Sequence, residues 1–251
     1  MVNKKVQRIK FIIAIMVVIL VAVAIGVRIH IYNKNGEKNM PYTISKIIVV
    51  STARKNENAE QQPTEGTESV WNFDIIQNND VYIEISNKNT RKNEKIKNVS
   101  IEDIQIVEAP KKGGIRVYMP NSLDGDRYTY TDEYEVGDSL TYRGADENSY
   151  KNLQLNRNGG IVSFSFTNKE VGNYASGNDT EVTFDGRMLS KLNLKNEDLK
   201  SKVSFNLIIE LDDGKKYSGK VELDINCEGL IENGTSKIEI TDFSNIVFKR
   251  I

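Results

Sequence analysis

The sequence has few of the residues on which much protein chemistry depends. It contains one cysteine and one histidine in 251 residues. An internal disulfide needs two cysteines, and a Ser-His-Asp triad or a histidine-rich zinc site needs histidine in the folded domain. The histidine, His30, lies in the flank of an apolar segment, where we expect an interface residue rather than a base or a metal ligand. Disulfide frameworks and histidine-dependent catalysis are therefore excluded.

Motifs of familiar catalytic sites are also missing. The sequence has no Gly-x-Ser-x-Gly, no Ser-x-x-Lys and no glycine-rich loop of the kind that binds phosphates. Its charge is balanced, with 34 Lys and Arg against 35 Asp and Glu, so no basic surface for nucleic acid is predicted. We expect no nucleic-acid partner, no cofactor and no catalytic residues, and the chain is not predicted to be an enzyme.

The chain does contain one long apolar run, over residues 11–27. A helix needs roughly 20 residues to cross a hydrocarbon layer about 30 Å thick. The apolar character continues to Tyr32, because Arg28 can reach the headgroups while its stem stays in lipid, and the ring of Tyr32 suits the interface. The sequence therefore predicts a transmembrane helix over residues 11–32 that contacts membrane lipid, with Arg28 and Tyr32 at the outer interface.

A cleaved signal peptide has a similar pattern. Basic residues precede the run, and Ala22-Val-Ala24 resembles a cleavage site. However, Ile25 and Val27 continue the apolar run through that site, where a signal peptide would have polar residues. A buried helix of a soluble protein would rarely be apolar on every face over this length. We therefore favour an uncleaved membrane anchor, although the sequence leaves open whether the helix is ever removed.

Charge around the run predicts its orientation. Only cations precede it, whereas residues 28–40 mix cations with an acid. Since the more basic flank stays in the cytoplasm, residues 1–10 are predicted to be a cytoplasmic tail, and the chain beyond about residue 33 is predicted to lie outside. An outer domain without disulfides, in a sequence rich in Lys, Asn and Ile, is typical of a bacterial envelope. We therefore predict a single-pass protein of the cell membrane.

Beyond a spacer at residues 33–41, β patterns dominate the sequence. Short runs of β-branched and aromatic residues alternate with polar ones, and turn residues recur about every 8–12 positions. This predicts an all-β region over residues 42–251, built as one large β-sandwich or two small ones. A mobile loop is expected at residues 54–69, which are almost entirely polar, and a division into two domains would fall near residues 121–137.

Residues 203–227 predict the clearest hairpin. Apolar residues occupy every second position on both arms. A two-residue turn would put the two apolar faces on opposite sides, whereas a three-residue loop at residues 212–214 keeps them together. The predicted pairs in this register are Leu211 with Lys215, Ile209 with Tyr217 and Phe205 with Val221.

Three other local patterns predict strand geometry. Residues 42–50 are apolar on both faces, which predicts a strand that is covered twice or bends. Residues 78–80, Asn-Asn-Asp, predict a turn. Residues 99–101 and 104–106 alternate out of phase with each other, which predicts a bulge at residues 102–103.

The last quarter of the chain predicts less regular structure. One short helical turn is expected near residues 189–199, the only helix predicted outside the membrane. Final strands are expected at residues 238–240 and 246–248, either separate or as one bent strand. Cys227 falls on the apolar face of its predicted strand, so we expect a buried thiol rather than a reactive one.

Acidic residues in one loop offer a candidate calcium site. Its members are Asp124, Asp126, Asp132 and Glu133. Their spacing misses the EF-hand pattern, which continues with a third acid and a glycine and ends in a glutamate. Solvated loop acids are the expected state, so no metal site is predicted, and calcium is the alternative.

Tyrosines cluster in the same part of the chain. The candidate partner-binding residues are Tyr128, Tyr130, Tyr134 and Tyr142. Tyrosines beside Asp and Asn in exposed loops are typical of surfaces that bind proteins or sugars, because rings give contact area at low entropic cost. Packing at edge strands is the alternative that we favour. An envelope protein or a glycan is the partner expected at such a surface.

The sequence thus favours a membrane-anchored envelope protein whose outer β-sandwich binds or scaffolds without catalysis. An envelope hydrolase that uses two carboxylates is the alternative, and it needs two buried acids that face each other in a cleft. An extracytoplasmic sensor is disfavoured, since a cytoplasmic tail of residues 1–10 leaves little to transmit a signal.

Overall fold

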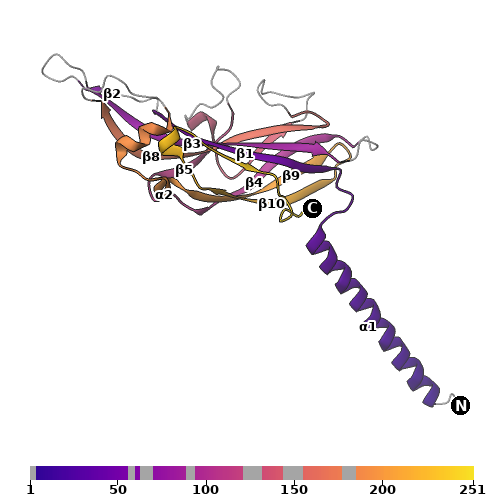
Figure 1. Ribbon diagram of the computed structural model, residues 1–251. Helices are drawn as coiled ribbons and strands as arrows, with labels where there is room; N and C mark the ends of the chain where they lie inside the picture. The colour runs from indigo at the N-terminus through magenta and orange to yellow at the C-terminus, as the bar shows by residue number, and fades with distance from the viewer. Residues whose placement is uncertain are drawn as a thin grey trace.

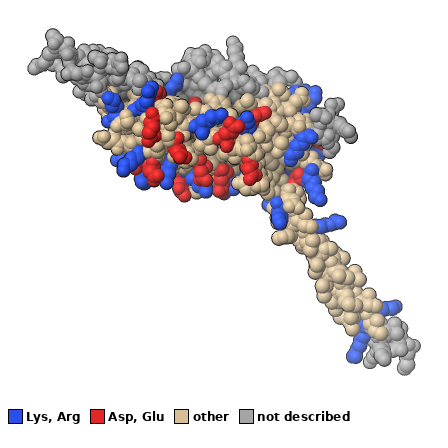
Figure 2. All heavy atoms as spheres, in the orientation of Figure 1, with Lys and Arg blue, Asp and Glu red and all other residues tan. Residues whose placement is uncertain are grey.

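The structure, a computed structural model, consists of a long helix and a β-sandwich (Figure 1). It describes residues 4–55, 60–62, 70–88, 94–120, 132–143, 155–176 and 185–251. Helix α1 (Lys4–Asn35) leaves one end of the sandwich as an isolated rod, and its residues 7–31 are exposed. Figure 2 shows Lys and Arg only toward the two ends of this rod. The predicted fold class, an apolar helix followed by an all-β sandwich, is confirmed.

Two antiparallel sheets form the sandwich. The strands of the larger sheet are β1 (Tyr42–Lys55), β2 (Glu60–Gln62), β3 (Val70–Asn87), β5 (Gly114–Tyr118), β6 (Glu135–Val136), β8 (Gly159–Ser176) and β11 (Ser236–Ile240). Those of the smaller sheet are β4 (Ile96–Glu108), β7 (Leu140–Arg143), β9 (Ser201–Leu211), β10 (Lys216–Ile225) and β12 (Lys249–Arg250). The strand orders are β11-β1-β3-β8-β5-β6, with β2 beside β3, and β12-β10-β9-β4-β7. Because strands alternate their side chains, each sheet turns one face to its partner sheet and one face away.

One hydrophobic core fills the space between the two sheets. Phe164 of the larger sheet and Phe205 of the smaller sheet meet edge to face, with ring centroids 5.4 Å apart and planes at 88°. This arrangement is favourable for aromatic rings because the positive edge of one faces the negative face of the other. Strands from before and after residues 121–137 contribute to this same core.

The hairpin of β9 and β10 has the predicted register. Leu211 and Lys215 flank the loop, and the N–H of Leu211 donates to the carbonyl of Lys215 at 2.9 Å. Gly214 takes the left-handed conformation, with φ 82°, and its N–H donates to Leu211 at 2.9 Å. The observed pairs include Ile209 with Tyr217 and Phe205 with Val221. A three-residue loop with glycine at its left-handed position therefore sets the register, as the pattern predicts.

Bulges bend two strands where the residue pattern changes. In β4, the register against β9 shifts between Glu102 and Gln105, as predicted, and Asp103 adopts φ 53°. Nδ2 of Asn206 donates to the carboxylate of Asp103 at 2.6 Å, which supports the bulge. In β1, the register against β3 shifts beside Ser45, so the strand that is apolar on both faces bends.

The turn predicted at residues 78–80 is wrong. β3 runs through these residues and pairs with β1 on one side and β8 on the other. Asn79 is buried, and its side chain accepts a hydrogen bond from Ser51 Oγ at 2.7 Å and donates one to the carbonyl of Phe166 at 2.9 Å. Because these long-range hydrogen bonds satisfy the amide inside the sheet, they override the local preference of asparagine for a turn.

Part of the loop expected at residues 54–69 is strand. Arg54 and Lys55 extend β1, and residues 60–62 form β2 against β3. Ladder hydrogen bonds come from the backbone, so they do not require apolar side chains. The rest of the expected loop lies outside the described residues.

The strand expected at residues 238–240 is present in β11, but the one expected at residues 246–248 is wrong. Only Lys249 and Arg250 pair with β10. Ile246 and Phe248 approach Gly219 of β10 instead, to 3.1 Å from where a Cβ would lie. Because Gly219 has no side chain, Ile246 and Phe248 can pack against β10 instead of pairing with it as a strand.

Short helices complete the domain. They are η1 (Asp132–Tyr134), η3 (Gly186–Leu192), α2 (Asn196–Leu199) and α3 (Leu230–Asn233). The helical turn expected near residues 189–199 is confirmed by η3 and α2. Helix α3 is not predicted by the sequence pattern; it is one turn long and lies between two glycines in the left-handed conformation, Gly229 and Gly234.

Candidate functional site

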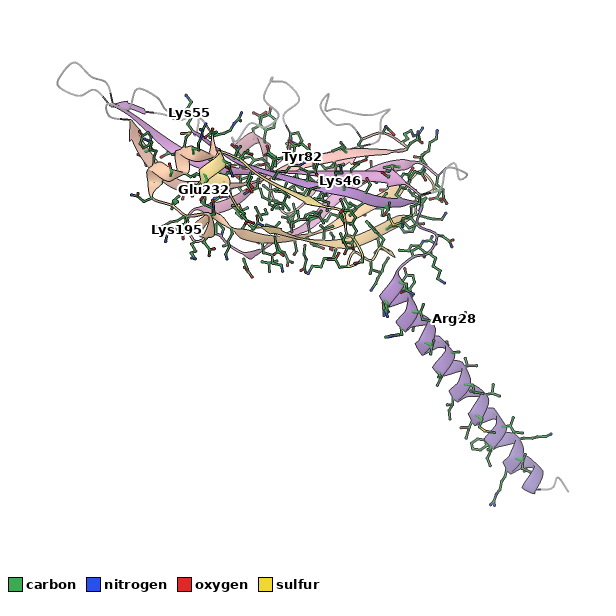
Figure 3. The ribbon with its side chains drawn as sticks, viewed as in Figure 1. Arg28, Lys46, Lys55, Tyr82, Lys195 and Glu232 are labelled. Atoms are coloured by element: carbon green, nitrogen blue, oxygen red, sulfur yellow. The ribbon has the colours of Figure 1, made fainter. Side chains whose placement is uncertain are left out.

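The apolar helix is the most distinctive surface of the molecule. Its segment Gln7–Asn35 is long and apolar enough to cross a membrane, and its most apolar stretch is not buried against the domain. A signal sequence near an N-terminus meets the same criteria. Arg28 is exposed near the sandwich end of α1 (Figure 3). Tyr32 is half-buried one turn further along the same helix. The residues predicted for the interface thus lie close to where the helix meets the folded domain.

The helix ends against the C-terminal segment of the chain. Gly36 follows α1 with φ 69°, and its N–H donates to the carbonyl of Tyr32 at 2.8 Å. The N–H of Glu37 donates to the carbonyl of Phe248 at 2.8 Å. A Cβ at residue 36 would overlap the Phe248 carbonyl and come within 2.8 Å of the Val247 side chain. Only glycine therefore combines this helix end with this contact.

Residues 246–251, which we call the C-terminal clamp, bind the last turns of α1. The N–H of Arg250 donates to the hydroxyl of Tyr32 at 2.9 Å. Nζ of Lys249 donates to Oδ1 of Asn33 at 3.1 Å. The predicted interface residue Tyr32 is thus also a contact of the folded domain.

The other side of the clamp belongs to the smaller sheet. Its two strand residues pair with β10, and the N–H of Ile251 donates to the carbonyl of Lys216 at 3.1 Å. The clamp therefore holds the helix end and one edge of the sandwich at the same time. This connection links the end of α1 to the smaller sheet through hydrogen bonds.

Tyr42 contacts segments from distant parts of the chain at the helix-proximal end of the sandwich. It is fully buried at the start of β1, with its hydroxyl 2.9 Å from the carbonyl oxygens of both Glu94 and Arg157. Burial raises the pKa of Tyr42, so its hydroxyl stays protonated and can donate. Nearby, the N–H of Asp212 donates to the carbonyl of Lys95 at 3.0 Å. Four segments distant in sequence therefore meet where the helix enters.

A buried group of polar side chains lies toward the opposite end of the sandwich. We call it the polar core cluster, and its members are Ser51, Gln77, Asn79, Asn168 and Cys227. Nε2 of Gln77 donates to Oδ1 of Asn79 at 3.1 Å and lies 2.9 Å from Sγ of Cys227. Nδ2 of Asn168 donates to Oε1 of Gln77 at 3.1 Å. None is more than 1% exposed, so the cluster is closed to solvent.

Cys227 is buried, as predicted, but it lies just beyond β10 with φ 53° rather than on the strand. Its Sγ donates to the carbonyl of Leu199 at 3.6 Å. Burial raises the pKa of the Cys227 thiol to about 11, so the thiol keeps its proton at neutral pH. Because the thiolate is the reactive form, we expect this residue to be inert.

Sequence reasoning missed the polar core cluster because residues 78–80 look like a turn. One signal could have found it. Asn79 shares its parity with Val81, Ile83 and Ile85, which predicts an inward-facing side chain once the strand is extended.

The structure does not bring the predicted tyrosines together on one described surface. Tyr142 is buried, and its hydroxyl donates to the carbonyl of Ser163 at 2.7 Å, so it contributes to the core. Tyr134 is half-buried in η1 and packs against Ile76 and Tyr118. Tyr128 and Tyr130 lie outside the described residues.

The candidate calcium ligands are only partly described. Asp132 lies in η1 with Glu133, which is exposed, while Asp124 and Asp126 lie outside the described residues. Across the part of the chain that the structure describes, no group of three or more His, Cys, Asp or Glu is placed to hold a metal. The calcium alternative therefore stays a prediction that depends on residues 124 and 126.

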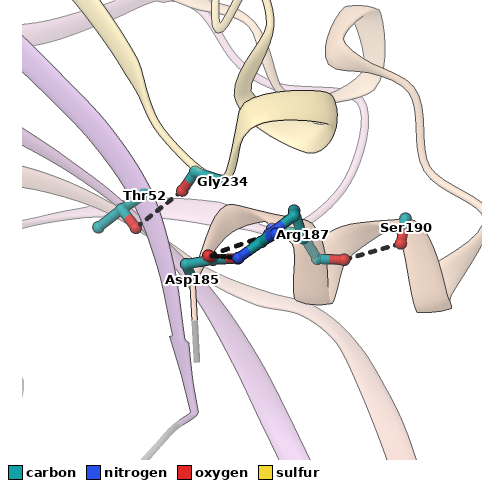
Figure 4. A network of polar contacts seen from close by, with 5 residues as sticks. All are labelled: Thr52, Asp185, Arg187, Ser190 and Gly234. Atoms are coloured by element: carbon teal, nitrogen blue, oxygen red, sulfur yellow. Dashed lines mark hydrogen bonds and ion pairs between the residues drawn. The ribbon is translucent and has the colours of Figure 1, made fainter. Parts of the chain in front are cut away.

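Among the residues whose burial the structure describes, no Asp or Glu is fully buried. Asp185 illustrates how a half-buried acid is used (Figure 4). The guanidinium of Arg187 donates to its Oδ2 at 2.7 Å and lowers the pKa of Asp185, and the Arg187 N–H donates to Oδ1 at 2.9 Å. Beside this cap, Thr52 donates to the carbonyl of Gly234 at 3.3 Å. The Asp185 cap starts η3, and the Thr52 hydrogen bond joins Gly234 to β1, so both contacts are structural.

Comparisons of this chain with protein-family models, with curated proteins and with solved structures found no match.

Proposed function

We propose that the protein is a single-pass membrane protein of the cell envelope whose outer β-sandwich binds or scaffolds other envelope components without catalysis. The observation that carries this proposal is α1, a helix with exposed apolar side chains that ends directly on the sandwich. Exposed apolar surface is unfavourable in water by about 25 cal/mol per Å². A hydrocarbon layer removes this cost and is as thick as the apolar segment is long.

The proposed orientation places the N-terminus in the cytoplasm. Lys4, Lys5, Arg8 and Lys10 precede the apolar segment with no acid among them. Segments rich in Lys and Arg are retained on the cytoplasmic side. The sandwich then lies outside, at the outer face of the membrane.

Two observations support a role without catalysis. The described residues include no buried pair of facing acids of the kind a carboxylate hydrolase needs. The thiol of Cys227 is enclosed and protonated. The partner surface that we propose is the loop region of Tyr128, Tyr130 and Tyr134, with an envelope protein or a glycan as the partner.

The anchor is tested by the fate of the N-terminus. We expect the mature protein to have the intact mass of the full chain and to stay in the membrane pellet at alkaline pH. Protease added to spheroplasts should degrade the sandwich, leaving the cytoplasmic tail protected. A soluble product that begins after Ala24 would show that the helix is a signal peptide instead.

A further inference from the structure

The helix-proximal end of the sandwich carries cations without acid partners. In the described part of the chain, those that make no ion pair with a carboxylate at this end are Lys34, Lys38, Lys88, Lys95, Lys249 and Arg250. Hydrogen bonds place members of this set near the helix exit. The N–H of Lys88 donates to the carbonyl of Pro41 at 2.7 Å, and the N–H of Arg250 donates to Tyr32. We call this set of cations the basic end.

The closest ion pairs of the described acids near this end are with cations outside the set, although Arg250 also helps to lower the pKa of Asp213. Asp212 pairs with Arg157 at 2.7 Å, and Asp213 pairs with Lys215 at 2.5 Å. Glu94 also pairs with Lys215, at 3.5 Å. Glu37 is a further acid among the described residues here, and it accepts the N–H of Asn39 at 3.2 Å.

The flanks of the sandwich are different. Lysines there lie beside acids, as in Lys46 with Glu239 at 3.3 Å and Lys97 with Glu210 at 2.9 Å. Figure 2 shows blue and red intermixed along the flank and mostly blue around the helix exit. The near-zero net charge of the chain therefore hides a local separation of charge.

We propose that the basic end rests on anionic lipid headgroups of the membrane that α1 crosses. This inference depends on the proposed anchoring. Attraction between a cation and an anionic membrane falls off within a Debye length, about 8 Å at physiological salt. The cations begin in the last turn of the helix at Lys34, and the clamp holds Lys249 and Arg250 against that turn. The basic end is thus kept at the headgroups, rather than carried away on a flexible linker.

The test uses the full chain in nanodiscs of phosphatidylcholine alone or mixed with anionic phosphatidylglycerol. Hydrogen exchange is followed at amides of the basic end that are hydrogen-bonded, those of Lys88, Arg250 and Ile251. We expect these amides to exchange several-fold more slowly in the anionic discs. High salt should remove the difference, since it shortens the Debye length.

A matched pair of variants separates position from charge. Lys38→Glu/Lys88→Glu changes two exposed lysines of the basic end, and Lys112→Glu/Lys195→Glu changes two exposed lysines elsewhere that also have no ion pair in the described structure. The first variant should lose the slowing in anionic discs, and the second should keep it. Both should match the wild type in phosphatidylcholine, which verifies the fold.

Equal exchange in the two lipids, or equal loss in the two variants, would overturn the inference. Failure of the chain to stay in the discs would overturn the anchoring and this inference together. That outcome is seen when the discs are purified, before exchange is measured, so the two failures are distinguishable.

Discussion

The two ends of the β-sandwich use their polar residues in opposite ways. Toward the distal end, uncharged polar side chains such as Gln77 and Asn79 are buried and bonded to one another. At the helix-proximal end, cations such as Lys38 and Lys88 stand in solvent without acid partners. The distal end bonds most of these polar groups to one another inside the fold, with Oδ1 of Asn168 as the exception in the cluster. The proximal end leaves charge exposed, and we propose that it faces the membrane that α1 crosses.

The largest change in stability is expected from breaking the polar core cluster at the distal end. Asn79→Ala leaves Ser51, Gln77 and the Phe166 carbonyl without their partner, and each buried polar group that loses its hydrogen bond costs about 1 to 3 kcal/mol. We expect the free energy of unfolding to fall by about 3 kcal/mol or more, measured by urea denaturation in detergent. Asn39→Ala, an exposed change at the proximal end, should stay within about 0.5 kcal/mol. Equal losses of unfolding free energy in the two variants would show that the polar core cluster does not stabilise the fold.

The next effect concerns pH at the distal end. The pKa of Cys227 is raised from 9.0 to about 11 by burial, so the folded protein keeps a proton that the unfolded chain loses. Its contribution to stability is therefore full below about pH 9 and is lost as the pH rises through about 11. We expect a loss of about 2 to 3 kcal/mol over this interval.

Cys227→Ala provides the reference for this measurement. It lacks the thiol but keeps Tyr42 and Tyr217, whose pKa values are also raised by burial, so their alkaline titration is common to both proteins. Parallel stability curves for the two proteins between pH 9 and 11 would contradict the buried thiol.

A smaller loss of stability is expected where α1 meets the C-terminal clamp. Gly36→Ala requires a left-handed alanine and displaces the Phe248 carbonyl, so we expect a loss of about 2 kcal/mol. Gly214→Ala has the same kind of backbone but nothing within 4 Å of its Cβ, and it should lose only about 1 kcal/mol. The difference between the two, from thermal unfolding in detergent, isolates the contact with the clamp. No difference would mean that the clamp does not hold the helix end.

The smallest effect concerns a single hydrogen bond. Tyr32→Phe removes the acceptor for the N–H of Arg250, which is worth about 1 kcal/mol. Hydrogen exchange at the Arg250 amide should accelerate by roughly fivefold, while amides of β9 serve as an internal control. An unchanged rate would show that Tyr32 does not support the clamp.

Local patterns predicted the parts of the fold that local geometry controls. The register of β9 and β10 follows from alternating apolar residues and the loop at residues 212–214. The long helix was predicted by an apolar run that would be unfavourable on a surface exposed to water. The bulge in β4 follows from a change of phase that a strand can absorb in few ways.

The parts that local patterns missed depend on partners distant in sequence. Asn79 continues a strand because Ser51 and Phe166 satisfy its amide. Gly36 ends the helix beside Phe248, and the sequence around residue 36 does not predict that contact. The basic end was hidden for a similar reason, since overall charge is balanced and only the fold collects unpaired cations on one side.

The central claim is that the clamp fixes the sandwich on its helix, with the basic end toward the membrane. Spin labels at Val27→Cys on α1 and Lys220→Cys on β10 would measure this directly in nanodiscs, since the buried Cys227 stays unlabelled. We predict one narrow distance distribution that broadens when Gly36→Ala is added. A broad distribution in the protein with Gly36 intact would contradict the account, because the domain would then move freely on its anchor.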